Sequence, residues 1–126
     1  MSTVPGADLL TIPTSTLETE TVRLRTTLRP TCSRLSEAVD LLRDSSPEAI
    51  LEGRWRLEDV HDRLGRLASE QQVPDLAARL NRIRDSLAGH LAAALDCSIA
   101  RVRPEVIAGV LCRGAAMVSA DLEAIA

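Results

Sequence analysis

Residues 46–67 read SPEAILEGRWRLEDVHDRLGRL, and this stretch decides the fold. Ser46 fits the capping position of a helix, Pro47 is preorganised for the first helical position, and Glu48 favours the positive end of the helix dipole. The apolar positions that follow recur in steps of three and four, which is the spacing of one helix face: Ile50, Gly53, Leu57, Val60, Leu64 and Leu67. The stretch therefore predicts an amphipathic helix with one apolar stripe.

The same spacing predicts a helix before this one, beginning at Ser15. Its stripe is Leu17, Leu24, Leu28, Leu35, Ala38 and Leu42. Pro30 lies inside it, and a proline in a helix interior removes a backbone donor and clashes with the preceding turn. A kink or a break is expected there, and the stripe continues in phase beyond Pro30, which favours the kink.

Two more helices are predicted after residue 67. The third starts near Pro74 with a stripe of Leu76, Leu80, Ile83, Leu87, Leu91 and Leu95, which can be extended to Ile99 and Val102. The fourth opens at Pro104, and its apolar face holds Ile107, Val110, Leu111, Val118, Leu122 and Ile125. Its small residues, Gly109, Gly114, Ala115 and Ala116, would let a neighbouring helix approach closely.

Composition supports this reading, because the chain of 126 residues has no Phe or Tyr, one Trp, and many Leu and Ala. Leu and Ala favour helices, whereas strands favour aromatic and β-branched residues. We expect an all-α fold: an antiparallel four-helix bundle, up-down-up-down, over residues 15–126. Residues 1–14, MSTVPGADLLTIPT, read as an extended, flexible N-terminal arm whose Leu9, Leu10 and Ile12 could pack against the protein itself or a neighbour.

Charge and cysteine usage exclude several classes. The net charge of −3 argues against a dedicated nucleic-acid binder. Cys32, Cys97 and Cys112 are odd in number and far apart, so we expect buried free thiols and no metal site or cofactor. The chain shows neither the pattern of a signal peptide nor an apolar run long enough to span a bilayer, and a cytoplasmic location is expected by default.

One group of residues on the 46–67 helix points away from its stripe. Leu51 and Trp55 lie one turn apart on the outer face, and Arg54 and Arg56 flank the tryptophan. Trp and Arg are enriched at the energetic centres of protein interfaces. These four residues are candidate partner-binding residues. The alternative is that the N-terminal arm, or a second face of the bundle, covers Trp55.

A second candidate is the stretch His61-Asp62-Arg63-Leu64-Gly65. It resembles the phospho-accepting His box on the dimerisation helix of bacterial sensor histidine kinases. The resemblance implies His61 as phospho-acceptor and Asp62 as its base, on a helical hairpin that dimerises into a four-helix bundle. Arg66 departs from the amide residue expected next, and no glycine-rich nucleotide-binding segment follows.

The arginines form clusters along the predicted helices, each close to acidic residues: Arg23, Arg25 and Arg29; Arg79, Arg82 and Arg84; Arg101 and Arg103. Solvated faces with ion pairs explain them, and a phosphate-binding groove formed by two clusters is the alternative. His90 lies near the apolar face of the third helix and reads as a half-buried histidine.

The sequence thus predicts a non-enzymatic interaction or assembly module that acts through helix–helix packing. It would self-associate or dock a partner helix. Two alternatives stay open: a histidine-phosphotransfer or dimerisation module centred on His61, and a helical binder of a small ligand.

Overall fold

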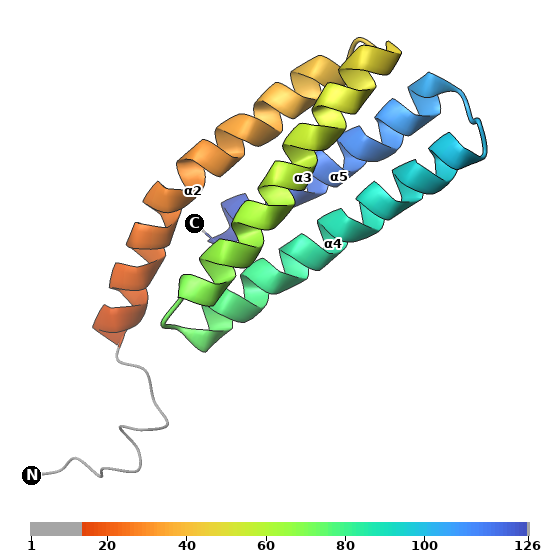
Figure 1. The fold of residues 1–126 in the computed structure, drawn as a ribbon. Coiled ribbons are helices and arrows are strands. Elements are labelled where there is room, and N and C mark those ends of the chain that lie inside the picture. The colour runs from red at the N-terminus through yellow and green to blue at the C-terminus, as the bar shows by residue number, and fades with distance from the viewer. Residues whose placement is uncertain (1–13, 126) are drawn as a thin grey trace, which may run out of the picture.

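The computed structural model describes residues 14–125, with side chains from residue 17 onward, and consists there of four helices (Figure 1). They are α2 (Thr14–Leu42), α3 (Pro47–Glu70), α4 (Pro74–Ile99) and α5 (Pro104–Ile125). Each helix packs against the next one along the chain, and α2 also packs against α5, which closes the bundle. Successive helices run in opposite directions, as predicted (Figure 1). The arm predicted for residues 1–14 lies outside the described residues, apart from Thr14, which begins α2.

The helix starts follow the predicted local signals. The Ser46 hydroxyl accepts a hydrogen bond from the Ala49 amide at 3.2 Å, and Pro47 is the first residue of α3. Pro74 and Pro104 begin α4 and α5 in the same way. Helix α2 continues through Pro30 without a break, so the alternative of two separate helices is wrong.

The core is built from the predicted stripes, which meet along the bundle axis. Buried on α2 and α3 are Leu24, Leu28, Leu35, Ala38, Leu42, Leu57, Val60 and Leu64. Buried on α4 and α5 are Leu76, Leu80, Ile83, Leu87, Ala94, Ile107, Leu111, Val118, Leu122 and Ile125. With so few bulky side chains, the helices must approach one another closely for these residues to touch.

Three positions of the predicted stripes are wrong. Leu17 is 40% exposed, because it lies near the start of α2, where a helix has few neighbours. On α4, Leu95 and Ile99 are 41% and 72% exposed. The buried row instead passes from Leu87 to Ala94, one position away from Leu95, and a difference of one position turns a side chain by about 100° around a helix.

Two glycines fix how closely the helices approach. A Cβ atom on Gly53 of α3 would lie 2.7 Å from Cγ of Leu42 on α2. A Cβ atom on Gly114 of α5 would lie 2.7 Å from Cβ of His90 on α4. The small-residue face predicted for the fourth helix therefore serves as expected at Gly114, whereas the space around Gly109 is open.

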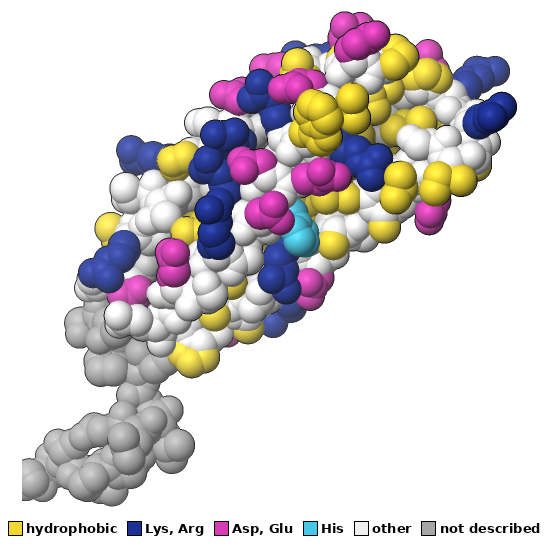
Figure 2. Space-filling view, viewed as in Figure 1, with side chains coloured by type: hydrophobic (Ala, Val, Ile, Leu, Met, Phe, Trp, Pro, Cys, Tyr) yellow, Lys and Arg dark blue, Asp and Glu magenta, His cyan; other side chains and the backbone are white. Residues whose placement is uncertain are grey.

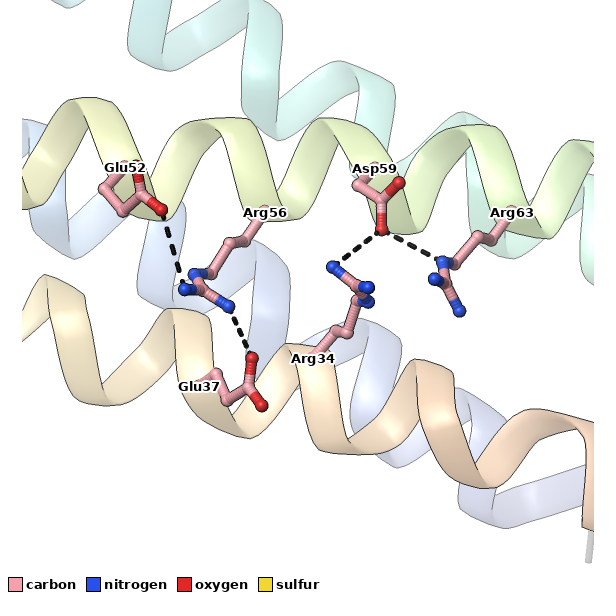
Figure 3. A network of polar contacts seen from close by, with 6 residues as sticks. All are labelled: Arg34, Glu37, Glu52, Arg56, Asp59 and Arg63. Atoms are coloured by element: carbon pink, nitrogen blue, oxygen red, sulfur yellow. Dashed lines mark hydrogen bonds and ion pairs between the residues drawn. The ribbon is translucent and has the colours of Figure 1, made fainter.

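Ion pairs join α2 and α3 along their outer edge (Figure 3). The Asp59 carboxylate lies 3.4 Å from the Arg34 guanidinium across the two helices and 2.9 Å from the Arg63 guanidinium one turn away. Arg56 forms a second link, because its guanidinium pairs with Glu37 on α2 and with Glu52 on α3. These pairs hold α2 and α3 in one register above the Gly53–Leu42 contact.

Candidate functional site

A groove lies at the end of the bundle where α3 begins and α4 passes into α5. It encloses about 300 Å³ and opens to solvent. Its lining is mostly apolar and comes from three helices: Pro47, Ile50, Leu51 and Arg54 of α3, Ser98 of α4, and Pro104 and Ile107 of α5. We call it the end groove. It combines an apolar wall with a single charged group, which is the usual composition of a binding site.

Large apolar side chains stand exposed beside the end groove. Leu51 is 47% exposed and Trp55 is 56% exposed on the outer face of α3. Leu95 and Ile99 lie exposed one turn apart on α4, with the groove residue Ser98 between them in the sequence. Hydrophobic side chains gather over this end of α3 and α4 in the space-filling view (Figure 2). We call Leu51, Trp55, Leu95 and Ile99 the apolar end face.

The four candidate partner-binding residues are divided between two sides of α3. Leu51 and Arg54 line the end groove, and Trp55 stands beside it. Arg56 lies on the opposite side, where it faces α2 and pairs with Glu37 and Glu52 (Figure 3). Its Nε atom is buried without a hydrogen-bond partner among the described residues, and its two terminal nitrogens form the pairs with α2 and α3.

The charges around the end groove are of both signs. The Arg54 side chain is 23% exposed, and its Nε atom lies 3.3 Å from the Glu58 carboxylate. Arg101 and Arg103 lie in the exposed connection between α4 and α5, and neither forms an ion pair with the residues described here. Asp96 and Glu105 are exposed on either side of that connection. A partner approaching this end therefore meets exposed arginines and exposed carboxylates together.

His61 and Asp62 lie in a different place, on the surface between α3 and α4. The His61 side chain is 33% exposed, and its Nδ1 atom lies 3.3 Å from the Asp62 carboxylate. Both line a shallow hollow with Asp59, Gly65, Arg66, Ser69 and Arg84. The imidazole is thus accessible, as the phospho-acceptor alternative requires.

The other histidine and the cysteines fit structural roles. His90 is half-buried against Gly114, and its Nδ1 donates to the Ser86 carbonyl at 2.9 Å. The three cysteines are free but partly exposed, which differs from the full burial expected. Burial raises the pKa of Cys32, and the negative charge of Glu123 raises this pKa further. Burial also raises the pKa of Cys112, although the positive charge of Arg43 offsets part of that rise. Both thiols are therefore poor nucleophiles near neutral pH.

Two of the three arginine clusters contain ion pairs with nearby carboxylates, as expected of solvated faces, whereas the Arg101–Arg103 cluster forms none with the described residues. Arg23 pairs with Glu20 and Arg79 with Asp75 along their own helices. No three His, Cys, Asp or Glu side chains among residues 17–125 come together in a group that could hold a metal ion. None of the four helices described combines the length and apolar character that a bilayer crossing requires.

Of the residues that line the end groove, the sequence singled out Leu51 and Arg54 as candidate binding residues and did not identify the others. Ser98, Pro104 and Ile107 come from the turn between two helices, and spacing along a single helix does not show that this turn lies opposite Leu51. Leu95 and Ile99 were expected in the core. The signal that could have located them is the presence of two neighbouring apolar rows on α4: Leu87 and Ala94 are buried, whereas in the second row Leu91 is only partly buried and Leu95 is exposed.

Comparisons of the chain with protein-family models, with curated proteins and with solved structures give no match.

Proposed function

We propose that this protein is a non-enzymatic assembly module that self-associates through its apolar end face. The observation that carries the proposal is the exposure of Leu51, Trp55, Leu95 and Ile99 around the end groove. Large apolar side chains scattered singly over a surface need no explanation, whereas a cluster beside an apolar groove is typical of an interaction site. Trp55 supplies a rigid aromatic anchor of the kind found at the centres of interfaces.

A second copy of the chain is the partner that the charges favour. A surface surrounded by charges of one sign repels other surfaces of that sign. The residues around the end groove carry both signs, since Arg101 and Arg103 lie there together with Asp96 and Glu105. Neither sign of charge on the approaching surface of a second copy is therefore repelled as a whole at this end. Most soluble oligomers are twofold homodimers, which adds to the preference for self-association.

The test is the mass of the protein in solution, measured by light scattering over a concentration series. We expect the wild-type chain to form a dimer and Leu51→Glu and Ile99→Glu to dissociate it, because each places a charge in the contact. Met117→Glu is the matched control, since Met117 is 46% exposed on α5, outside the apolar end face. All three exposed substitutions should change the stability of the fold by less than about 0.5 kcal/mol. A monomeric wild-type chain at every concentration would rule out the proposal.

His61 supports a second candidate, a phosphotransfer or dimerisation module. Its accessible ring lies in a hollow with Arg66 and Arg84, whose guanidinium groups suit a phosphoryl group. Because Nδ1 faces Asp62, Nε2 is the nitrogen with a free lone pair when Nδ1 carries the proton. Attack by Nε2 on a phosphoryl donor would form the N–P bond.

Phosphoramidate is a suitable probe of this candidate, because the N–P bond to His61 forms as the donor's P–N bond breaks and ammonia leaves. The candidate predicts one acid-labile phosphoryl group per chain, lost in His61→Gln and kept in His90→Gln. Absence of any label on the wild-type chain would dismiss it. The expected small-ligand alternative would instead show a ligand-dependent rise in melting temperature, with the end groove as its site.

The proposal includes the expected cytoplasmic location. Three free thiols, Cys32, Cys97 and Cys112, suit a reducing compartment, since oxidising compartments favour disulfides.

A further inference from the structure

We infer that the end groove of each copy receives the apolar segment Leu9–Ile12 of a second copy. This inference rests on the proposed self-association and names what enters the groove. Residues 8–12 read DLLTI and lie outside the described residues. They hold three large aliphatic residues in an otherwise small and polar stretch, and the end groove offers an apolar space of about 300 Å³.

Charge complementarity supports this occupant. Asp8 is the one charged side chain of residues 1–13, and it directly precedes the apolar segment. Arg54, which also pairs with Glu58, is the one charged residue in the lining of the end groove, and Arg101 and Arg103 lie in the connection that borders it, between Asp96 and Glu105. Entry of the segment would bring its carboxylate beside these guanidinium groups, which form their strongest hydrogen bonds with carboxylates.

The segment Leu9–Ile12 cannot reach the end groove of its own chain, because the two lie at opposite ends of the bundle. Gly53 of α3 lies beside Leu42, at the end of α2, so Leu51 and the groove lie at the bundle end opposite to Thr14. Helix α2 is 29 residues long, which corresponds to about 43 Å at the rise of an α-helix. Leu9 precedes Thr14 by five positions, and an extended chain of five residue steps spans about 17 Å. The segment therefore falls far short of its own groove.

A second copy that runs antiparallel alongside the first removes this obstacle. In such a dimer the start of α2 of one copy lies beside the end groove of the other. The twofold axis then makes the exchange reciprocal, so each copy supplies one segment and one groove. Two such contacts in one dimer strengthen each other, because formation of the first makes the second intramolecular.

The experiment uses the full-length chain and its single tryptophan. Trp55 stands beside the groove, so its emission should be blue-shifted in the dimer and shift to the red on dilution. Three variants are compared with the wild-type chain. The first is a double variant that carries both Leu9→Ser and Leu10→Ser, and the second is Leu51→Glu. The third is the control Val4→Ser, which removes an apolar residue outside the segment. The double variant should raise the dissociation constant of the dimer at least about tenfold, through the lost burial of both leucines, whereas the control should not.

A synthetic peptide of residues 6–14, GADLLTIPT, tests the contact directly. Added to the double variant, it should shift the emission of Trp55 to the blue in a saturable way, and a scrambled peptide should not. The same peptide should have no effect on Leu51→Glu.

The possible failures are distinct from one another. If Leu51→Glu dissociates the dimer and the double variant leaves both mass and emission unchanged, self-association stands and the inference about Leu9–Ile12 is wrong. If the wild-type chain is monomeric throughout, the proposed function itself fails. A monomer whose Trp55 emission still depends on Leu9 and Leu10 would overturn the exchange between copies, because the segment would then act within one chain.

Discussion

The side chain of Leu42 occupies the space that a side chain on Gly53 would need. A Cβ atom on Gly53 would lie 2.7 Å from Cγ and 2.8 Å from Cδ2 of Leu42. Leu42 ends α2 and is 1% exposed, so it has little room to move away. The first pair of helices is therefore held together by a contact that depends on a glycine within a helix.

Replacement of Gly53 should destabilise the fold despite the better helix propensity of alanine. Gly53→Ala gains about 1 kcal/mol from propensity but overpacks Leu42 at a cost of about 1–3 kcal/mol, for a net loss of about 1 kcal/mol. Gly89→Ala is the control, because Gly89 has open space around it and should gain about 1 kcal/mol. Denaturant unfolding measures both. Equal gains at the two positions would contradict the close contact.

Replacement of Pro30 should stabilise the protein. Helix α2 runs through this residue, so the Thr26 carbonyl lacks the backbone donor that any other residue at position 30 would supply. Pro30→Ala restores that bond and removes the ring clash, and we expect a gain of about 2 kcal/mol after allowance for the more flexible unfolded chain. Arg29→Ala, a neighbouring exposed position, should change little. A melting temperature unaffected by Pro30→Ala would mean that α2 does not depend on this bond.

The ion pairs between α2 and α3 should contribute modestly and in a salt-dependent way. Asp59→Asn removes the partner of both Arg34 and Arg63, but the Asp59 side chain is 39% exposed. We expect a loss of less than about 1 kcal/mol in low salt that nearly vanishes at high ionic strength. The comparison variant is Asp85→Asn, whose 72% exposed carboxylate pairs with Arg84 alone and should have almost no effect. A loss that persists at high salt would show that Asp59 acts through packing or uncharged hydrogen bonds.

The pH dependence of the thiols follows from the raised pKa of Cys32 and Cys112, both above the ordinary value of 9.0. Because folding raises the pKa of each thiol, the contribution of that thiol to folding stability is fully present below pH 9. This contribution is lost as the pH rises through the raised pKa of the folded state. We therefore expect slow alkylation of both thiols at pH 8 in the folded protein and faster alkylation after unfolding in urea. Mass spectrometry of each modified cysteine measures the two rates. Equal rates in both states would contradict the burial of these sulfur atoms.

The helices could be predicted because their signals are local. Pro47, Pro74 and Pro104 mark the three starts, and a buried stripe of leucines needs only the periodicity of one helix. The end of α4 could not be predicted in this way. Sequence reasoning weighs Leu95 above Ala94 because leucine buries more area, yet α4 turns Ala94 into the core in line with Leu87 and leaves Leu95 41% exposed.

The candidate site was predictable to a lesser degree, for the same reason. The outward position of Leu51 and Trp55 follows from the stripe of α3, and the structure places both on the surface. The separation of Arg56 from them, and its link to Glu37, depends on the register between α2 and α3. The Gly53–Leu42 contact helps to set that register, and contacts between distant parts of the chain leave no periodic signal.

The lone tryptophan stands on the surface, at the apolar end face, and a core of leucine, alanine, valine and isoleucine contains no aromatic ring. The near-ultraviolet signal of this protein therefore arises from the apolar end face, while the interior is spectroscopically silent. Emission reports on what lies against α3, and loss of the fold has to be followed by the far-ultraviolet signal of the backbone. The proposed assembly and the unfolding of the chain, which overlap in most optical measurements, can therefore be followed separately without any added label.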